Sequence, residues 1–331
     1  MKTIEITERE AGQRLDKFLG KYMSLAPKSF FYKMLRKKNI VLNGKKAEGS
    51  ERLTAGDCLT LYLAEETIGK FTGGCVPAGS GFPKKPPFSL LYEDENILVL
   101  NKPWGMLTQK AKPDDVSLNE HMIAWLVDTG RMTEEQIRLQ KPSVCNRLDR
   151  NTSGIVLAGI SLKGLQGLSR ILKDRTAEKR YYALVWGHVR EARQLKGYLV
   201  KDTKTNQVQV FSSETIEDAS YIETAYRPLG YGGGCTLLEI HLITGRSHQI
   251  RAHLKAEGHF VIGDPKYGRQ EVNREFSGKF GLKGQLLHAG TFAMPAENCP
   301  FPQLAGRKFT APLEPRFVKV LNGLGIAVPG E

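Results

Sequence analysis

A short stretch of the chain, NRLDRNTSGIVLAG at residues 146–159, places one carboxylate between two guanidinium groups. Asp149 stands between Arg147 and Arg150, just before an apolar, β-branched run that predicts a buried strand. The two arginines would favour an ionised carboxylate, which can act as a nucleophile or as a base. Thr152, with the serine and glycine after it, suits a tight turn around that group. The alternative is a structural ion pair that holds the turn.

Other kinds of catalytic chemistry find little support in the chain. His248 and His253 are five residues apart, which does not place two imidazoles on one helix face for a metal. The five cysteines are scattered and never paired as C-x-x-C, so we expect reduced thiols in a cytosol. The sequence also lacks a P-loop and a G-x-S-x-G elbow. Zinc deaminases, hydrolases and nucleotide-driven enzymes are therefore disfavoured. His288, in LLHAG, is expected to be packed or hydrogen-bonded and not to bind a metal.

The charge of the chain is concentrated near its N-terminus. The 331 residues carry a net charge of +13, and residues 14–46 hold ten Lys or Arg against one acid, Asp16. Such a block is typical of proteins that bind phosphate backbones, although a solvated surface is the alternative. There is no run of about 18 apolar residues and no apolar signal segment. We expect a cytoplasmic protein without membrane contact, and the length suggests about two domains.

The first 63 residues predict a compact α/β module. Apolar residues at helical spacing indicate a helix over 15–22, and Pro27 marks the start of a second helix. Asn43 and Gly44 between two short runs are typical of a type I′ hairpin. Alternation over 57–63 predicts a half-buried closing strand.

The rest of the chain predicts a linker and a larger domain. Residues 64–87 are rich in Gly and Pro without periodicity, which indicates a mobile tether. Residues 88–331 alternate strands and helices, and we expect a mixed α+β domain with a largely antiparallel sheet. One of its helices should begin at Ser247 as N-cap and end at Gly258.

The N-terminal module resembles the S4 RNA-binding domain. The resemblance covers residues 13–63 and lies in the order of RLDKFL, a basic second helix and IVLNGK. It implies that this module contacts RNA through its exposed basic side chains, namely Lys28, Lys33, Arg36, Lys37, Lys38 and Lys45.

The larger domain strongly resembles the RluA-type pseudouridine synthases. RLDRNTSG is similar to the family signature H-R-L-D-x-x-T-S-G. Four further matches occur in the family's order: YEDENILVLNKPWGML, EKRYYALVWG, LITGRSHQIRAHLKAEGHFVIGDPKYG and QLLHA. Together they span about 200 residues. The family signature begins with His where this chain has Asn146, which we interpret as a tolerated structural variant.

The resemblance implies the reaction and the residues that perform it. Uridine in RNA is converted to pseudouridine without a metal, nucleotide or organic cofactor. Asp149 matches the catalytic aspartate, which attacks C1′ or the uracil ring, or removes a sugar proton. Tyr181 matches the tyrosine that stacks on the flipped uracil, while Tyr182 is expected to pack. Arg246 matches the basic partner of the aspartate.

The remaining basic and polar residues are assigned to the substrate. Arg251 is an alternative partner for the aspartate, or it binds phosphate. Arg147 matches the arginine that helps to displace the target base, and Arg150 and Thr152 lie beside it. We expect a monomer that acts on ribosomal RNA, most simply the large-subunit RNA. The alternatives are a transfer-RNA pseudouridine synthase and a non-catalytic, ribosome-associated RNA-binding protein.

Overall fold

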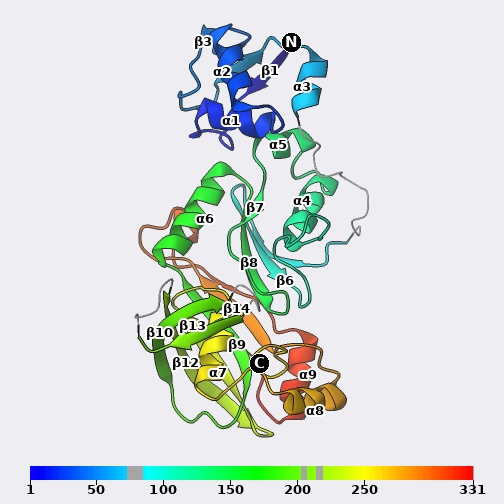
Figure 1. The fold of residues 1–331 in the computed structure, drawn as a ribbon, viewed down its shortest axis with the longest axis vertical. Helices are drawn as coiled ribbons and strands as arrows, with labels where there is room; N and C mark the ends of the chain where they lie inside the picture. The colour runs from blue at the N-terminus through cyan, green and yellow to red at the C-terminus, as the bar shows by residue number, and fades with distance from the viewer. Residues whose placement is uncertain (73–84, 203–206, 214–218, 331) are drawn as a thin grey trace.

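The computed structural model describes residues 1–72, 85–202, 207–213 and 219–330. An N-terminal module holds a small antiparallel sheet in the order β1-β4-β2-β3. Its strands are β1 (Lys2–Glu5), β2 (Ile40–Leu42), β3 (Lys45–Lys46) and β4 (Cys58–Leu61). Two helices, α1 (Leu15–Tyr22) and α2 (Lys28–Arg36), complete the module at the top of Figure 1.

Local sequence signals account for this module. The apolar stripe of α1 is buried, since Leu15, Phe18 and Leu19 have no exposed surface. Pro27 is the N-cap of α2, as its fixed φ allows. Asn43 and Gly44 both have positive φ, 52° and 71°, as the type I′ turn between β2 and β3 requires. The two predicted helices, the hairpin and the closing strand are therefore confirmed.

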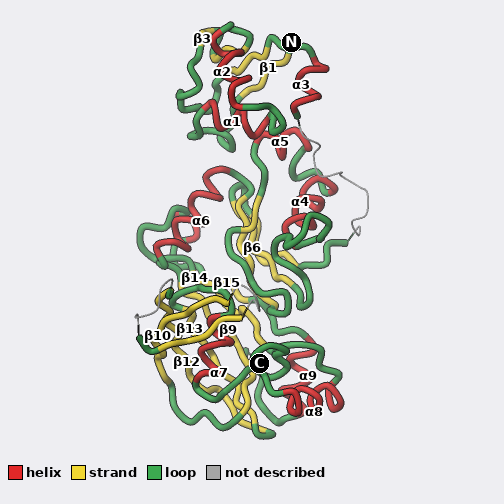
Figure 2. The backbone as a smooth tube through the Cα atoms, viewed as in Figure 1, coloured by secondary structure: helices red, strands yellow, loops and turns green. Residues whose placement is uncertain are grey.

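The larger domain is built on an 11-stranded sheet, whose strands are yellow in Figure 2. The main path runs β11-β10-β12-β13-β9-β14-β8-β6-β5, with β15 added to β14 and β7 added to β8. Only the β8–β14 pair is parallel among the described ladders. The strands are β5 (Ser89–Glu93), β6 (Ile97–Lys102), β7 (Ser143–Val144), β8 (Ser153–Gly159), β9 (Glu178–Trp186), β10 (Arg193–Asp202), β11 (Gln207–Phe211), β12 (Ser220–Gly232), β13 (Cys235–Leu242), β14 (Leu287–Ala293) and β15 (Lys308–Thr310).

Helices cover both faces of this sheet. The core beneath α4 (Leu118–Asp128) and α7 (Gln249–Ala256) includes Tyr181 and Leu238. On the other face, α6 (Leu162–Asp174) packs in one apolar cluster, and α8 (Gln270–Phe280) and α9 (Pro315–Gly323) pack in another. The predicted α+β class with a largely antiparallel sheet is confirmed. No helix in the described ranges has the length and apolar content to span a bilayer.

The connection between the two parts differs from the predicted mobile tether. Residues Glu65–Phe71 form helix α3, where we expected linker, because Ile68 is buried in the N-terminal core. Acidic residues in its first turn suit the positive end of the helix dipole. Residues 73–84 of the predicted linker lie outside the described residues.

The N-terminal module also packs against α5 (Glu134–Leu139) of the larger domain. Leu139 belongs to the apolar core of the N-terminal module. The Lys21 ammonium donates to the Gln140 side chain at 3.0 Å, and Lys2 pairs with Glu135 at 2.7 Å. The two parts are therefore joined by a packed contact, which the composition of the linker did not indicate.

Candidate active site

Asp149 lies in the loop that joins β7 to β8. The loop leads into β8, whose second residue, Gly154, has a φ of +110° and pairs with β14. A Cβ atom at this position would lie 2.2 Å from the carbonyl oxygen of Ala289. Only glycine combines that φ with such a close approach of two backbones. The end of the Asp149 loop is thereby fixed against the central sheet.

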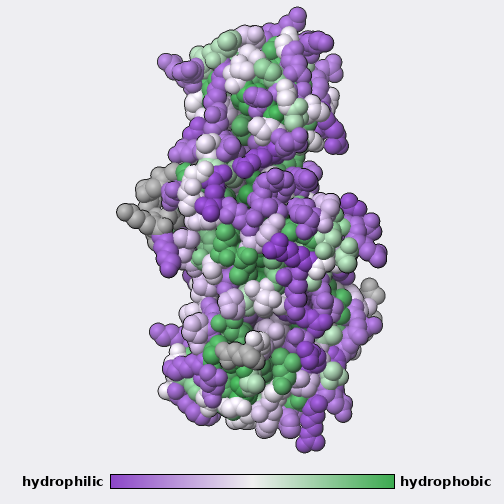
Figure 3. Space-filling view, turned by 180° about the vertical axis from the view of Figure 1, so that it is seen from behind, coloured by the Kyte–Doolittle hydropathy of each residue, from purple (hydrophilic) through white to green (hydrophobic). Residues whose placement is uncertain are grey.

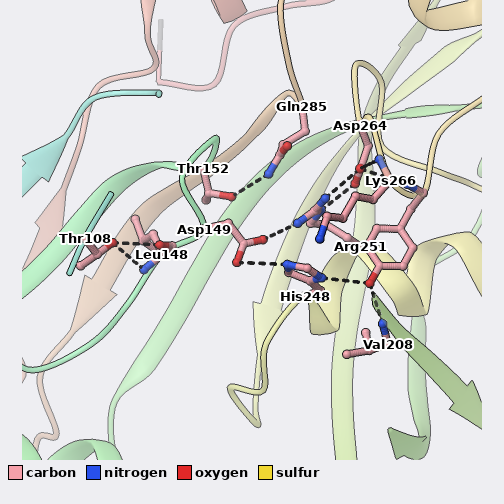
Figure 4. Close-up of polar contacts among 11 residues, drawn as sticks. Thr108, Leu148, Asp149, Thr152, Val208, His248, Arg251, Asp264, Lys266 and Gln285 are labelled. Carbon is pink, nitrogen blue, oxygen red and sulfur yellow. Dashed lines mark hydrogen bonds and ion pairs between the residues drawn. The ribbon is translucent and has the colours of Figure 1, made fainter. Parts of the chain in front are cut away.

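The residue before Asp149 is held by a buried hydroxyl. Thr108 Oγ1 donates to the carbonyl oxygen of Leu148 at 2.8 Å and accepts from the Leu148 N–H at 3.1 Å (Figure 4). Thr108 is 3% exposed, so water does not compete for these bonds. Both backbone polar groups of Leu148 are therefore fixed by Thr108, which holds the backbone directly before Asp149.

A buried lysine, Lys102, connects the loop after β6 with the loop that carries Asp149. Lys102 has no exposed surface, and its ammonium donates to three carbonyl oxygens. These belong to Pro103 at 3.0 Å, Met106 at 2.8 Å and Arg150 at 3.2 Å. Three carbonyls match the three N–H donors of an ammonium group. Lys102 thus links the loop after β6 to the residue that follows Asp149.

Arg251, on α7, is the cation that pairs with Asp149. Its Nη1 lies 2.7 Å from Asp149 Oδ2, while its Nε and Nη2 grip both oxygens of Asp264 at 2.6 and 2.8 Å (Figure 4). The Arg251 side chain is 5% exposed and that of Asp264 is 0%, whereas Asp149 is 27% exposed. The arginine is therefore anchored from behind and presents its remaining edge to a carboxylate that solvent reaches.

The charges around Arg251 outweigh its burial. Burial alone would lower the pKa of the guanidinium, but the hydrogen bond and charge of Asp264, with the charge of Asp149, raise it. Asp264 is itself fixed by the backbone N–H groups of Lys266 and Tyr267, at 2.9 and 3.1 Å. Arg251 consequently stays cationic and in one orientation.

Among the described contacts Asp149 pairs with Arg251, the alternative partner expected from the sequence, and not with Arg246. Arg246 is exposed, and its backbone N–H donates to Gln249 Oε1 at 3.0 Å. Arg246 precedes α7, whereas Arg251 lies in its first turn on the buried side of the helix and so reaches the Asp149 carboxylate. The helix itself begins later than predicted, since its N-cap is His248 and not Ser247.

The arginines beside Asp149 in the sequence do not pair with it among the described contacts. Arg147 and Arg150 are both exposed, and Arg150 Nε donates to the carbonyl oxygen of Gly105 at 3.2 Å. The chain turns directly after Asp149, where the Thr152 N–H donates to the Asp149 carbonyl at 3.0 Å, and neither guanidinium contacts the carboxylate in the described residues. Both guanidinium groups are left facing solvent around the loop.

The two tyrosines of β9 face opposite sides of the sheet. Tyr181 is 8% exposed and lies in the same core as α4 and α7. Burial, with a smaller contribution from the Asp149 charge, raises the pKa of Tyr181, so the phenol keeps its proton. Tyr182 packs in the cluster of α8 and α9, against Gly290 of β14.

Thr152 and Asn146 bond within the protein. The Thr152 hydroxyl accepts from Gln285 at 3.3 Å, and its backbone N–H donates to the Asp149 carbonyl at 3.0 Å. Asn146 Oδ1 accepts from the Leu157 N–H at 2.7 Å, and Nδ2 donates to the carbonyl of Ile155. The asparagine amide therefore ties the loop to β8, a task that requires no proton transfer.

Sequence reasoning missed several residues of this site. Lys102 lies in the YEDENILVLNKPWGML motif and Thr108 directly follows it, whereas Asp264 lies in the GDPKYG segment of the LITGRSHQIRAHLKAEGHFVIGDPKYG block. His248 was considered only as a metal ligand, yet its Nε2 lies 4.0 Å from Asp149 Oδ1. The available signal was that Lys102, His248 and Asp264 lie inside the matched motifs and that Thr108 directly follows one.

The six basic residues predicted to contact RNA are all exposed. Lys33 and Arg36 lie on α2, and Lys45 lies on the neighbouring hairpin. None of the six forms an ion pair with a carboxylate in the described part of the chain. Hydrophilic side chains prevail over this upper end of the molecule in Figure 3. The charge is therefore available to a polyanion.

Known proteins resemble this chain over most of its length. Residues 96–256 match the family model described as RNA pseudouridylate synthase. The chain is 30% identical over 300 residues to ribosomal large subunit pseudouridine synthase C of Vibrio cholerae serotype O1, covering 89% of this chain and 90% of that protein. It is 30% identical over 302 residues to the protein of the same name in Escherichia coli K12, covering 87% of each.

A solved structure has the same fold. Human RNA pseudouridylate synthase domain containing 4 superposes with a TM-score of 0.59 at 20% identity, over 73% of this chain and 95% of that one. The sequence relatives span nearly the whole chain, and the matched family model includes Asp149, Tyr181 and Arg251. The chain therefore belongs to the RluA-type family of RNA pseudouridylate synthases.

Proposed function

We propose that the protein converts uridines of large-subunit ribosomal RNA to pseudouridine, with Asp149 as the catalytic carboxylate. The observation that carries this proposal is the pairing of a solvent-reachable Asp149 with a buried, anchored Arg251. A structural ion pair would have no need to expose its acid while burying its base. The relatives named above as large-subunit enzymes support the class of RNA.

The reaction changes the uracil atom that is bonded to C1′ of the ribose from N1 to C5. The N1–C1′ bond breaks, the detached ring turns, C5 bonds to C1′, and the proton of C5 is lost while N1 gains one. Asp149 attacks C1′ or the ring, or removes a sugar proton, and each route needs an ionised carboxylate. Arg251 holds that carboxylate by charge and by hydrogen bonding.

Tyr181 suits the face of the extruded uracil. Its side chain lies in the core shared with α7, and the charge of Asp149 contributes to the raised pKa of its phenol, which supports a position near the carboxylate. Its phenol retains its proton and so can donate it late in the reaction. Extruding a base costs a few kcal/mol, and stacking on an aromatic ring offsets part of that cost. The exposed Arg147 and Arg150 suit the vacated position and the flanking phosphates.

The N-terminal module would supply the remaining affinity. We assign residues 1–63 to an S4-like RNA-binding domain, and residues 88–331 to the catalytic domain. The exposed cations of α2 and of the β2–β3 hairpin would contact phosphates of a structured RNA. Specificity would then depend on RNA shape and on bases that can leave the stack.

The substrate is tested by offering unmodified large-subunit RNA and unmodified transfer RNA to the purified protein. Pseudouridine is then mapped chemically in each RNA. We expect product at discrete positions of the large-subunit RNA only. Product in transfer RNA alone would reassign the substrate, and no product in either RNA would favour a non-catalytic binding protein.

A further inference from the structure

His248, at the start of α7, has an unusual backbone conformation. Its φ is 55° and its ψ is 12°, in the left-handed region that residues with a β-carbon seldom adopt. Such conformations persist where the surroundings hold them, and they gather at functional sites. The ring forms no cap hydrogen bond with α7, so helix capping does not explain it.

The imidazole lies between a tyrosine and the catalytic carboxylate. Nδ1 is 2.9 Å from the Tyr267 hydroxyl. Nε2 is 4.0 Å from Asp149 Oδ1 (Figure 4). The side chain is 13% exposed. Arg251 occupies the other oxygen of the same carboxylate, Oδ2. The two oxygens of Asp149 therefore face two different groups of α7.

The Tyr267 hydroxyl determines which ring nitrogen carries hydrogen. Its oxygen accepts from the Val208 N–H at 2.9 Å. Across the described residues, the recorded contacts offer its proton one acceptor, His248 Nδ1. Burial raises the pKa of Tyr267 and lowers that of His248, so the phenol keeps its proton and the imidazole is neutral. The single ring hydrogen is then on Nε2, which faces Asp149.

We propose that His248 is a positioning residue whose Nε2–H donates to Asp149 Oδ1 once RNA fills the site. This inference rests on the proposed function of Asp149. A gap of 4.0 Å exceeds a hydrogen bond, and such contacts are often long in a free enzyme and shorten in the complex with substrate. With Arg251 at Oδ2 and His248 at Oδ1, the plane of the carboxylate is fixed toward the nucleotide.

His248 and Arg251 are supported by the same two residues, Tyr267 and Asp264. Tyr267 donates its backbone N–H to Asp264, which in turn grips Arg251. The Arg251 guanidinium also lies 5.0 Å from the centre of the Tyr267 ring. Both donors to Asp149 thus share one support, so their relative position is preserved.

Three substitutions separate positioning from stability. His248→Gly removes the ring and suits the positive φ, so folding should be retained. His248→Gln carries an amide N–H near the position of Nε2, whereas that of His248→Asn stops near Nδ1. Asn also tolerates this backbone region, which makes it the matched control.

The single-turnover rate on RNA and the dissociation constant of RNA are measured for each variant. We expect the Gly and Asn variants to lose about 10- to 100-fold in rate, with the dissociation constant within about twofold. The Gln variant should recover much of the rate. Thermal unfolding of each variant checks that the fold is retained, and the loss of the Tyr267 contact should lower the melting temperature of the Gly and Asn variants alike.

A wild-type rate in the Gly variant, or equal rates in the Gln and Asn variants, would overturn the proposal. The Asp149→Asn variant is assayed in parallel. If it still forms pseudouridine, the proposed function of Asp149 fails. If it is inactive while His248→Gly is fully active, only the inference about His248 fails.

Discussion

At the scale of single residues, the site depends on one arginine that serves two carboxylates. Arg251 binds a fully buried acid, Asp264, and a partly exposed acid, Asp149. The buried acid fixes the arginine, and the arginine then fixes the exposed acid. This division explains how a carboxylate stays oriented while it remains open to substrate.

Replacing Arg251 with Met should damage stability as well as activity. The Asp264 carboxylate would lose its charged partner in the interior, which costs about 3–5 kcal/mol. Denaturant unfolding measures the free energy of unfolding directly. Arg227→Met is the control, because it removes an arginine that is 57% exposed from its pair with Glu239. A variant at Arg251 as stable as that control would contradict the account.

Replacing Thr108 with Val should act on the peptide before Asp149. The change leaves the N–H and carbonyl of Leu148 without their partner, which costs about 1–3 kcal/mol of stability and lowers the turnover rate. Thr108→Ser keeps the hydroxyl and should stay near wild type in both measurements. Equal behaviour of the Val and Ser variants would show that the hydroxyl is not the support we describe.

The identity of the catalytic candidate could be predicted from sequence, whereas its partner could not. Asp149 lies in a local motif, but its ion pair joins residues 102 positions apart. Whether Arg246 or Arg251 reaches it depends on where α7 begins and on which side it packs. Those are properties of the tertiary structure, and neighbouring residues do not encode them.

At the scale of elements, His288 joins three segments of the central sheet. Its Nδ1 lies 2.9 Å from the Ser153 hydroxyl at the start of β8, and its Nε2 lies 3.2 Å from the carbonyl of Ala311, just after β15. The ring has no exposed surface. It therefore ties the entry of β8, where the Asp149 loop ends, to β14 and to the segment beyond β15.

Acid should weaken this junction. Burial lowers the pKa of His288 to about 4, below the value of about 6.5 for an exposed histidine. Between those values the unfolded chain binds a proton that the folded chain does not. The contribution of neutral His288 to the free energy of unfolding is therefore fully present above about pH 6.5. The free energy of unfolding falls by about 3 kcal/mol as the pH is lowered toward 4.

The effect is measured as the fall in unfolding free energy between pH 7 and pH 4.5. His288→Gln cannot bind the proton, so its fall should be smaller than that of the wild type. All other acid-sensitive groups are shared by the two proteins. An identical fall in both would show that His288 is not responsible.

Elements with local signals were predictable, and elements defined by long-range pairing were less so. Helix α1 and the β2–β3 hairpin follow from apolar spacing and from Asn-Gly. By contrast, α3 lies in a stretch that was expected to be linker, and only the burial of Ile68 in the N-terminal core explains its helical fold. A seven-residue helix carries too little periodicity to be recognised alone.

At the scale of the whole molecule, the N-terminal module presents its cations while one face rests on α5. A change in composition between the two parts was visible in the sequence. Their contact was not, because it depends on single residues of a distant helix such as Leu139. A docked module holds its basic surface in a defined relation to the larger domain, so under the proposed function RNA bound to the module would be oriented for Asp149.

Neutralising four of these cations should weaken RNA binding. The variant replaces Lys33, Arg36, Lys37 and Lys38 by Ala. Each lost phosphate contact should reduce the slope of log affinity against log salt by roughly 0.7 to 0.9. The matched control removes four exposed cations of the catalytic domain: Lys163, Lys173, Lys279 and Lys283. Equal salt slopes for the two variants would remove the role of the N-terminal module.

The central claim is that Asp149 performs the isomerisation, and replacing its carboxylate by an amide tests that claim most directly. Asp149→Asn keeps the size of the side chain and removes its charge. We predict that pseudouridine formation on unmodified large-subunit RNA is abolished while the dissociation constant for that RNA stays within about threefold. Pseudouridine formed by the Asn variant at the rate of the wild-type protein would contradict the account.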